Sequence, residues 1–274
     1  MYLEFYSLKE NPFNVTSDPN FLYLSHTHQE ALNHLIYGIN HRKGFIEITG
    51  EIGSGKTTLC RALLSRLDDK TKTSIIFNSS LPESQMLEAI VEDFGVKPER
   101  RGKGAYIKAL NHFLLQQLSE GNNAVLIIDE AQNLRLSALE TIRMLSNLET
   151  EKEKLLQIIL VGQPQLRDKL DSPDLEQLRQ RISVRFHVKA LNSDEIPAYI
   201  QHRLRIAGSP GKISFVPETI AAILAYTKGI PRLINLVCDK SLLMGFVRET
   251  YVIDPEIVRK SVEEIEGAAS VMVA

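Results

Sequence analysis

The sequence predicts an α/β fold: a body built on a parallel five-stranded sheet, followed by a small C-terminal domain made only of helices. Between Phe45 and Val188, short apolar runs alternate with longer amphipathic segments. This pattern is typical of parallel strands that are covered by helices on both faces. After Ala190 the strand-like runs stop, and helical periodicity with Gly and Pro punctuation follows. We therefore expect three parts: a strap and helix at 1–43, an α/β domain at 44–190 and a helical domain at 191–274.

The composition is that of a folded protein without an excess of charge. Of the 274 residues, 43% are hydrophobic and 24% are charged, which argues against extensive disorder. The formal net charge of -2 argues against a generally basic nucleic-acid binder. Cys60 and Cys238 lie far apart within apolar helical patterns, so we expect buried free thiols in a reducing, cytoplasmic setting. No sequence stretch approaches 18 consecutive apolar residues, and direct membrane insertion is not expected.

The N-terminal part, residues 1–43, is predicted to combine an extended segment rich in aromatic residues, here called the strap, with one helix. Asn11-Pro12 and Asp18-Pro19 interrupt regular structure, and aromatic side chains surround them. We expect the strap to press on an apolar surface. Its aromatic residues are Phe5, Tyr6, Phe13, Phe21 and Tyr23. The helix that follows is predicted from a stripe of apolar residues, namely Ala31, Leu32, Leu35, Ile36 and Ile39.

The strands and helices of the two later parts follow from periodicity. Five apolar runs are the predicted strands: Phe45–Thr49, Thr73–Asn78, Ala124–Asp129, Leu155–Val161 and Ser183–Val188. Leucine and isoleucine recur every three residues from Leu136 to Leu148, which predicts a helix after Asn133. Four further helices are predicted at 194–207, 217–227, 231–247 and 254–265.

The segment from Gly50 to Thr57 matches the pattern G-x-x-x-x-G-K-[ST]. Glycines let backbone N–H groups curl around phosphate oxygens, and the helix starting near Lys56 directs its positive end at the same anion. Lys56 is expected to reach the β- and γ-phosphates of ATP, and the Thr57 hydroxyl to bind Mg²⁺. The preceding apolar run and the following amphipathic helix favour a true phosphate loop over a chance match. The predicted nucleotide-binding residues here are Gly50, Glu51, Ile52, Gly53, Ser54, Gly55, Lys56, Thr57 and Thr58.

Two carboxylates, Asp129 and Glu130, end the third apolar run. Because the carboxyl ends of parallel strands gather at one edge, Asp129 is expected to reach the Mg²⁺ held by Thr57. Glu130 is then expected to polarise the water that attacks the γ-phosphate. The alternative is a helix N-terminus that simply favours acidic residues. The phosphate loop favours the catalytic interpretation, and a glutamate at 130 favours hydrolysis over passive nucleotide binding.

These two motifs, with strand-like runs between and after them, resemble the AAA+ superfamily. Further segments resemble the secretion ATPase family typified by GspA and ExeA, and together the similarity extends over residues 3–265. Those segments are Asn11-Pro12-Phe13, Asp18–Tyr23, Tyr37–Ile39 ahead of Gly44-Phe45, Ile127–Leu134, Val161–Pro164 and Gly229–Asn235. The resemblance implies a P-loop AAA+ body and a C-terminal lid domain.

The resemblance also implies roles for several polar residues. Gln163 takes the sensor-1 position, which hydrogen-bonds the γ-phosphate or the attacking water. Arg232 takes the sensor-2 position, at the start of a lid helix whose first turn suits Pro231; a solvated surface arginine is the alternative. AAA+ relatives carry an arginine finger, donated to the neighbouring subunit, where this chain has Arg179, Arg181 and Arg185. Arg181 is favoured and Arg185 is second. The predicted catalytic residues are therefore Glu130, Gln163, Arg181, Arg185 and Arg232.

The flat, apolar adenine ring of ATP needs an apolar binding pocket from which water is excluded. Pro12, Phe13 and Tyr23 are predicted to supply it, because the rings of the strap have no obvious amphipathic helix to join. The alternative is that these side chains are core packing.

The main functional hypothesis is a cytoplasmic AAA+ ATPase that uses Mg-ATP to drive assembly or remodelling of a larger, secretion-related complex. Its expected partners are other copies of itself, in a hexamer or a related ring or helix. A membrane or secretion component would be contacted through another chain, at the inner face of the membrane. GspA-type proteins continue into a transmembrane helix and a periplasmic peptidoglycan-binding region. Residues 1–274 include neither, which leaves the secretion role open.

Two alternatives remain at the sequence level. The module also resembles transposition regulators of the TnsC/TniB type, which implies an AAA+ protein that forms ATP-dependent oligomers on duplex DNA. Candidate phosphate contacts in that case are Lys97, Arg100, Arg101 and Lys103, unless they form a solvated loop. The second alternative is a nucleotide switch that binds ATP without hydrolysing it. Glu130 and the candidate arginine fingers weigh against this switch.

Overall fold

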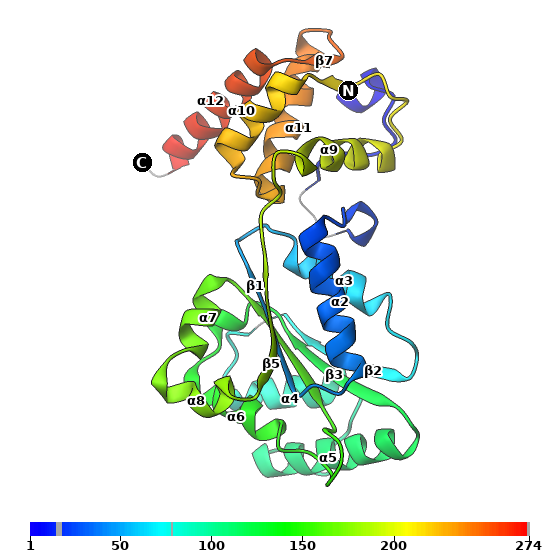
Figure 1. The fold of residues 1–274 in the computed structure, drawn as a ribbon, viewed down its shortest axis with the longest axis vertical. Helices are drawn as coiled ribbons and strands as arrows, with labels where there is room; N and C mark the ends of the chain where they lie inside the picture. Colours follow the sequence, from blue (N-terminus) through cyan, green and yellow to red (C-terminus); the bar gives the residue numbers. More distant parts are fainter. Residues whose placement is uncertain (15–17, 78, 273–274) are drawn as a thin grey trace. The chain divides into compact units, whose positions relative to one another are not determined.

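The computed structural model describes residues 1–14, 18–77 and 79–272, and it divides into two compact units (Figure 1). One unit, here called the sheet unit, contains Thr27–Gly50 and Leu59–Val188. The other, the helical unit, contains Met1–His26, Glu51–Thr58 and Lys189–Ala274. The phosphate loop thus groups with the C-terminal helices. The predicted domain boundaries after residues 43 and 190 stay a prediction.

The sheet unit is built on five parallel strands in the order β2-β3-β4-β1-β5 (Figure 1). The strands are β1 (Phe45–Gly50), β2 (Thr71–Ile76), β3 (Asn123–Ile128), β4 (Gln157–Gly162) and β5 (Ile182–Val188). Every residue of β1 and β4 is buried, which explains why these strands are mostly apolar in the sequence; the buried polar residues are Glu47 and Thr49 of β1 and Gln157 of β4. The predicted parallel five-stranded sheet is confirmed. The predicted end of the second strand, Asn78, lies outside the described residues.

Helices cover both faces of this sheet. They are α2 (His26–Asn40), α3 (Lys56–Leu64), α4 (Glu83–Asp93), α5 (Lys103–Ser119), α6 (Leu136–Leu145), α7 (Pro164–Leu170) and α8 (Glu176–Arg179), with short 3-10 turns η2 (Ala131–Asn133) and η3 (Pro173–Leu175). Apolar residues of α4 to α8 form one core with Phe45 of β1. Ile46 points to the opposite face, as strand geometry requires. There α2 lies so close that a side chain at Gly38 would meet Ile46 Cδ1 at 2.4 Å.

The helical unit contains the four helices that the sequence predicts. They are α9 (Glu195–Ile206), α10 (Pro217–Thr227), α11 (Pro231–Val247) and α12 (Pro255–Met272). Three of them begin with proline, whose missing N–H costs nothing in the first helical turn. Two short parallel strands, β6 (Ser214–Phe215) and β7 (Val252–Ile253), join this region. Strands of two residues leave no periodicity in a sequence, so they were not anticipated.

The N-terminal strap, with α1 (Tyr2–Phe5) and η1 (Pro19–Phe21), packs into the core of the helical unit. Arg203 of α9 holds it: Nε donates to the carbonyl oxygen of Pro12 at 2.6 Å, and Nη2 donates to that of Asn14 at 2.9 Å. The same guanidinium lies 4.5 Å from the ring centre of Phe21, a cation–π arrangement. The apolar surface on which the strap presses is therefore that of the C-terminal helices.

Both cysteines are buried in the protein interior, as predicted, and neither forms a disulfide. Burial raises the pKa of the Cys238 thiol, which keeps it protonated and unreactive. In the part of the chain that the structure describes, none of the helices has the length and apolar character to cross a lipid bilayer.

Candidate functional site

Three of the predicted catalytic and metal-binding residues, Asp129, Glu130 and Gln163, follow strands that end at the same edge of the sheet. Because all five strands are parallel, the carboxyl ends of β1, β4 and β3 lie side by side, with β4 in the middle. The phosphate loop leaves this edge after Gly50, Asp129 follows β3 directly, and Gln163 follows β4 directly. Ligands of open α/β sheets bind at this edge, beyond the carboxyl ends of the strands.

The loop after β1 has the local geometry of a phosphate cradle. Gly53 and Gly55 have φ angles of 80° and 95°, a region in which other residues are strained. The Ser54 N–H donates to the carbonyl oxygen of Glu51 at 3.1 Å, which closes the turn. Lys56, the first residue of α3 and only 6% exposed, folds back so that Nζ donates to the same Glu51 carbonyl at 2.9 Å. These residues fit a phosphate chain followed by a helix N-terminus.

Arg232 packs directly on this loop. Its backbone N–H donates to the carbonyl oxygen of Gly53 at 3.2 Å. A Cβ atom built on Gly53 would lie 2.5 Å from Arg232 Cβ, so only glycine permits this approach. Pro231 begins α11, as the sequence predicts, and Arg232 is the second residue of the helix. The structure thus brings Arg232 to the phosphate loop; its contact with a phosphate stays a prediction.

The acidic pair sits in a sharp bend and not in a regular helix. Glu130 has a φ angle of 52°, and its N–H donates to Asp129 Oδ1 at 2.9 Å. The Ser79 hydroxyl donates to the Glu130 carbonyl oxygen at 2.6 Å and fixes the bend. The next α-helix, α6, begins only at Leu136. Glu130 is, however, the N-cap residue of the 3-10 turn η2, so the alternative of a helix start that favours acidic residues stays open.

Two glutamine side chains hold the Glu130 carboxylate. Gln132 Nε2 donates to Glu130 Oε2 at 2.5 Å, and Gln163 Nε2 donates to the same oxygen at 3.2 Å. The Gln163 N–H in turn donates to Gln132 Oε1 at 3.1 Å. The structure therefore brings the predicted residues Glu130 and Gln163 together. Gln132 was missed, although a polar side chain two residues after a catalytic carboxylate is a signal that sequence reasoning can use.

Arg181 lies at the other edge of the sheet. It precedes β5, whose first residue pairs with the first residue of β1, so it is at the amino-terminal edge, away from the phosphate loop's strand end. Its Nη1 donates to Ser146 Oγ at 3.0 Å and to the Asn147 side chain. Arg179, at the end of α8, is exposed, and its side chain makes no hydrogen bond or ion pair among the described residues.

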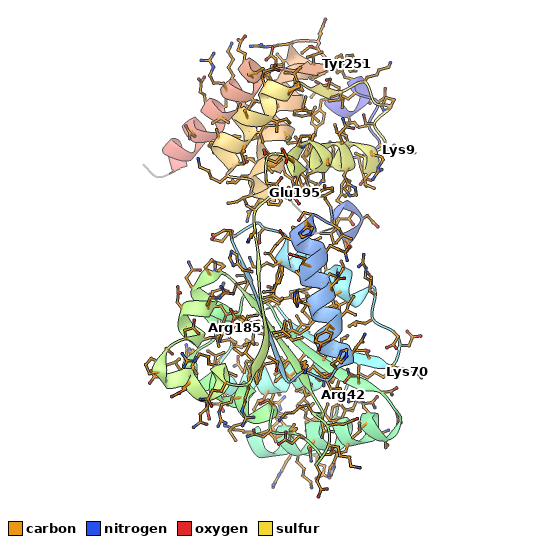
Figure 2. The ribbon with its side chains drawn as sticks, viewed as in Figure 1. Lys9, Arg42, Lys70, Arg185, Glu195 and Tyr251 are labelled. Atoms are coloured by element: carbon orange, nitrogen blue, oxygen red, sulfur yellow. The ribbon has the colours of Figure 1, made fainter. Side chains whose placement is uncertain are left out.

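Arg185, the second candidate finger, is labelled in Figure 2. It belongs to an ion-pair cluster within its own chain. Its Nε lies 3.2 Å from Oε2 of Glu47, a fully buried carboxylate of β1, and its Nη1 lies 3.0 Å from Asp171 Oδ1. Arg167 Nε contacts the other Glu47 oxygen at 3.2 Å. A buried carboxylate needs such partners, so Arg185 has a structural role besides the predicted catalytic one.

The three predicted adenine contacts lie in the helical unit. Pro12 and Phe13 are buried, Phe13 with only 1% of its surface exposed and its ring 6.4 Å from that of Phe215. Tyr23 is partly buried and meets Tyr199 edge-on at 5.9 Å. These rings pack in the core of the C-terminal helices, which agrees with the expected apolar surface beneath the strap. Their adenine contact stays a prediction.

Replacing Phe13 with alanine separates the two roles. A buried phenylalanine contributes about 3–5 kcal/mol to stability, so we expect a marked loss in the free energy of unfolding. In the folded variant, affinities for ATP and for inorganic triphosphate are then compared by calorimetry. A larger loss for ATP is expected if the ring contacts adenine. Equal losses for both ligands would mean that the strap is core packing alone.

Residues 39–170 match a family model described as an AAA domain. This part of the chain is an AAA domain. The chain is 40% identical over 268 residues to general secretion pathway protein A of Aeromonas hydrophila. The alignment covers 97% of this chain and 49% of that protein, so the chain spans about half the length of its relative.

Solved structures share the fold of this AAA domain protein. CDC6P from Pyrobaculum aerophilum superposes with a TM-score of 0.63 at 20% identity, over 89% of this chain and 70% of that one. The ORC2 protein of Aeropyrum pernix superposes with a TM-score of 0.63 at 18% sequence identity, over 86% of this chain and 66% of that one. The RuvB Holliday junction branch migration motor of Thermotoga maritima superposes with a TM-score of 0.57 at 19% sequence identity, over 86% of this chain and 68% of that one. At these identities the similarity is one of fold alone, and it confirms the predicted AAA+ body with a helical C-terminal region.

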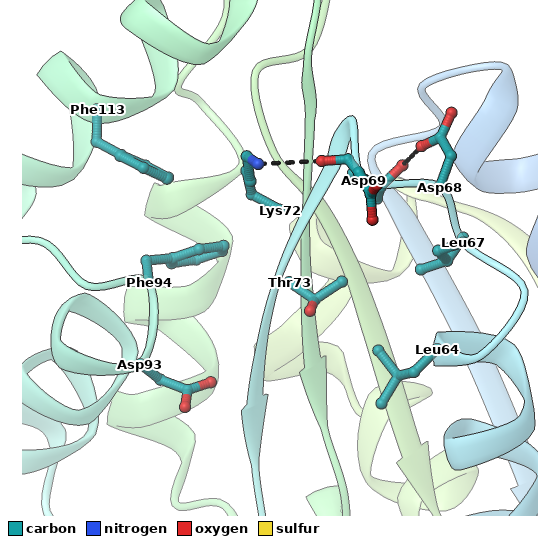
Figure 3. Close-up of a pocket in the computed structure, with 10 residues that line it drawn as sticks. Leu64, Leu67, Asp68, Asp69, Lys72, Thr73, Asp93, Phe94 and Phe113 are labelled. Atoms are coloured by element: carbon teal, nitrogen blue, oxygen red, sulfur yellow. Dashed lines mark hydrogen bonds between the residues drawn. The ribbon is translucent and has the colours of Figure 1, made fainter.

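Two hollows lie elsewhere on the AAA domain. One, of about 600 Å³, borders the edge strand β2 (Figure 3). Figure 3 shows Phe94 and Phe113 on one side of Thr73, and Leu64 and Leu67 on the other. The hollow contains none of the predicted site residues. We assign it no function.

The second hollow, of about 690 Å³, lies between the segment after α4 and one face of α5. Lys97 and Arg100, two of the four candidate DNA contacts, line it together with Lys108. The other two lie near carboxylates of α4: Lys103 Nζ lies 2.6 Å from Glu83, and Arg101 Nε lies 3.7 Å from Glu88. The Arg101 side chain is 92% exposed, so this pairing leaves it accessible to a phosphate.

Proposed function

We propose that this AAA domain protein binds and hydrolyses Mg-ATP and uses the turnover to drive assembly or remodelling of a larger complex. The observation that carries the proposal is the convergence at one sheet edge. Three adjacent parallel strands of the sheet unit end at that edge, and Gly50, the first residue of the phosphate loop, the pair Asp129–Glu130 and Gln163 stand at or directly after their ends. A phosphate loop alone supports nucleotide binding, and a carboxylate beside a sensor-type amide supports hydrolysis.

Each residue then has a definite task. Loop N–H groups from Gly50 to Thr58 and the Lys56 ammonium bind the phosphates. Thr57 and Asp129 are the proposed ligands of Mg²⁺, which neutralises phosphate charge when it is bound. Glu130 accepts the proton of the attacking water, and Gln163 hydrogen-bonds that water or the γ-phosphate. Arg232, packed on Gly53, turns its guanidinium to the same phosphates. Pro12, Phe13 and Tyr23 are the proposed adenine contacts.

The 40% identity to general secretion pathway protein A supports a place in a secretion-related complex. The proposed partners are other copies of this chain, in a hexamer or a related ring or helix. A membrane or secretion component would be reached through another chain, on the cytoplasmic face.

Hydrolysis is proposed to need a neighbouring subunit, with Arg181 as the arginine finger. A finger contributes roughly 10³-fold or more to the rate, so specific activity should rise steeply with protein concentration. Arg181→Ala should remove this gain with little loss of stability, because its partners Ser146 and Asn147 are uncharged. Arg185→Ala is the matched comparison. This substitution removes one ion-pair partner of the buried Glu47 carboxylate and should lower the free energy of unfolding by about 1–3 kcal/mol.

Mixing experiments test the assignment. Arg181→Ala subunits keep an intact phosphate loop, whereas Lys56→Ala subunits keep an intact finger, so mixtures should recover part of the lost turnover if the two assemble. A rate per subunit that stays constant with dilution, measured on a strict monomer, would contradict the trans role and the oligomeric proposal.

The DNA-associated alternative is tested in the same assay. Lys97, Arg100 and Lys108 line the second hollow together with one carboxylate, Glu99, so the cations outnumber the anions there and an anionic ligand is proposed. Stimulation of ATP turnover by duplex DNA, lost in Lys97→Ala/Arg100→Ala, would favour this alternative over a purely protein-directed role.

A further inference from the structure

We propose that Gln132 is a positioning residue that fixes which oxygen of Glu130 faces the attacking water. This inference rests on the proposed role of Glu130 as the base. It adds a residue that the two nucleotide motifs do not contain.

The two oxygens of the Glu130 carboxylate have different surroundings. Gln132 Nε2 at 2.5 Å and Gln163 Nε2 at 3.2 Å both donate to Oε2. Oε1 accepts no hydrogen bond from any residue that the structure describes. A carboxylate has about four lone-pair positions, and here two amide donors occupy one oxygen. Oε1 is therefore the oxygen left to accept a proton from water.

Gln132 is itself held in one orientation. Its Oε1 accepts from the Gln163 N–H at 3.1 Å while its Nε2 donates to Glu130. Turning the amide over would set its oxygen against a carboxylate and its NH₂ group against an N–H, so both bonds would become repulsive contacts. The amide plane therefore has a single favourable setting.

Neighbouring groups fit this arrangement. Lys169 Nζ donates to the carbonyl oxygens of Gln132 and Leu134, which anchors the backbone of η2. A Cβ atom at Gly162 would lie 2.7 Å from Gln132 Oε1, so the glycine that ends β4 leaves room for the amide. A functional side chain held by such a supporting shell keeps the angle that proton transfer requires.

The two glutamines are not equivalent under the proposed function. Gln163 is the side chain proposed to turn toward the γ-phosphate or the attacking water, and in doing so it releases Glu130. Gln132 has no such second task, so it still holds Oε2 when Gln163 leaves. The loss of Gln132 should therefore disturb the base itself, whereas the loss of Gln163 should also disturb the phosphate end of the site.

Two variants of Gln132 test this. Gln132→Leu removes both hydrogen bonds at nearly the same side-chain size. Gln132→Glu keeps an acceptor for the Gln163 N–H but sets a second carboxylate beside Glu130. We expect kcat to fall roughly 10- to 100-fold in both variants, with the ATP dissociation constant changed by less than about twofold. Gln180→Leu, at an exposed glutamine of α8's C-terminal end, is the control and should change none of these values.

A second readout does not depend on turnover. In protein without nucleotide, we compare the unfolding free energies of the wild type, Gln132→Leu, Glu130→Ala and the double variant, which together form a double-mutant cycle. A direct contact predicts that the double variant loses less than the sum of the single losses.

Additive losses in this cycle together with a wild-type kcat in Gln132→Leu would overturn the inference. A fall in kcat that merely follows a fall in melting temperature in both Gln132 variants would also overturn it. The proposed base fails separately: Glu130→Gln would then turn over normally, whatever Gln132 does.

Discussion

Replacing Glu130 with glutamine is expected to slow ATP hydrolysis by about 100-fold or more while ATP stays bound, because a general base contributes roughly that factor. The substitution is conservative at this site. The new side chain keeps its length, and its carbonyl oxygen can still accept from the amides of Gln132 and Gln163, which now meet Oε2. The bend held by Ser79 depends on the Glu130 backbone and is not touched. What disappears is the negative charge that accepts a proton.

Single-turnover phosphate release and ATP binding, measured on the same preparation, check this expectation. Glu176→Gln, an exposed carboxylate on α8, is the matched control and should behave as wild type. Normal turnover in Glu130→Gln would mean that Glu130 only shapes the end of β3 and that another group is the base.

Replacing Lys56 with alanine is expected to abolish nucleotide binding or nearly so. Lys56 is the only cationic side chain within the loop Gly50–Thr58, and it removes charge repulsion between neighbouring phosphates. It is already folded along the loop, with Nζ on the Glu51 carbonyl oxygen, so little side-chain freedom is lost when a phosphate takes that bond. Alanine removes the charge and the donor together.

Fluorescence titration with a labelled ATP analogue measures this loss. Lys70→Ala, an exposed lysine just before β2 (Figure 2), controls for the change in net charge. Melting temperatures of both variants show whether the fold survives. ATP affinity in the wild-type range for folded Lys56→Ala would contradict the assignment of this loop.

The strands and the phosphate loop were predictable for physical reasons. A strand such as β4, buried on both faces, is mostly apolar, with Ile158 to Val161 as a continuous run, and so it stands out from the amphipathic helices around it. The glycines at 53 and 55 adopt positive φ angles that their spacing to Lys56 already suggested. Prolines at 217, 231 and 255 marked three helix starts. These signals are local, and each is complete within a few neighbouring residues.

The remaining features depend on contacts between residues far apart in the chain. Nothing near Arg185 indicates that it pairs with Glu47, because the pairing follows from the register of β5 against β1. The residues around Phe13 in the sequence do not indicate that its ring packs near Phe215, in the core formed by the C-terminal helices. The orientation of Gln132 requires both β3 and β4 to be in place.

The central claim is that this AAA domain protein hydrolyses ATP and does not merely hold it. Steady-state phosphate release by the purified chain at saturating ATP, with and without Mg²⁺ and over a range of protein concentrations, tests it most directly. The account predicts release that requires Mg²⁺, rises per subunit with concentration, and exceeds that of Glu130→Gln by about 100-fold or more. Tight ATP binding with release no faster than in Glu130→Gln at any concentration would contradict it and would describe a nucleotide switch.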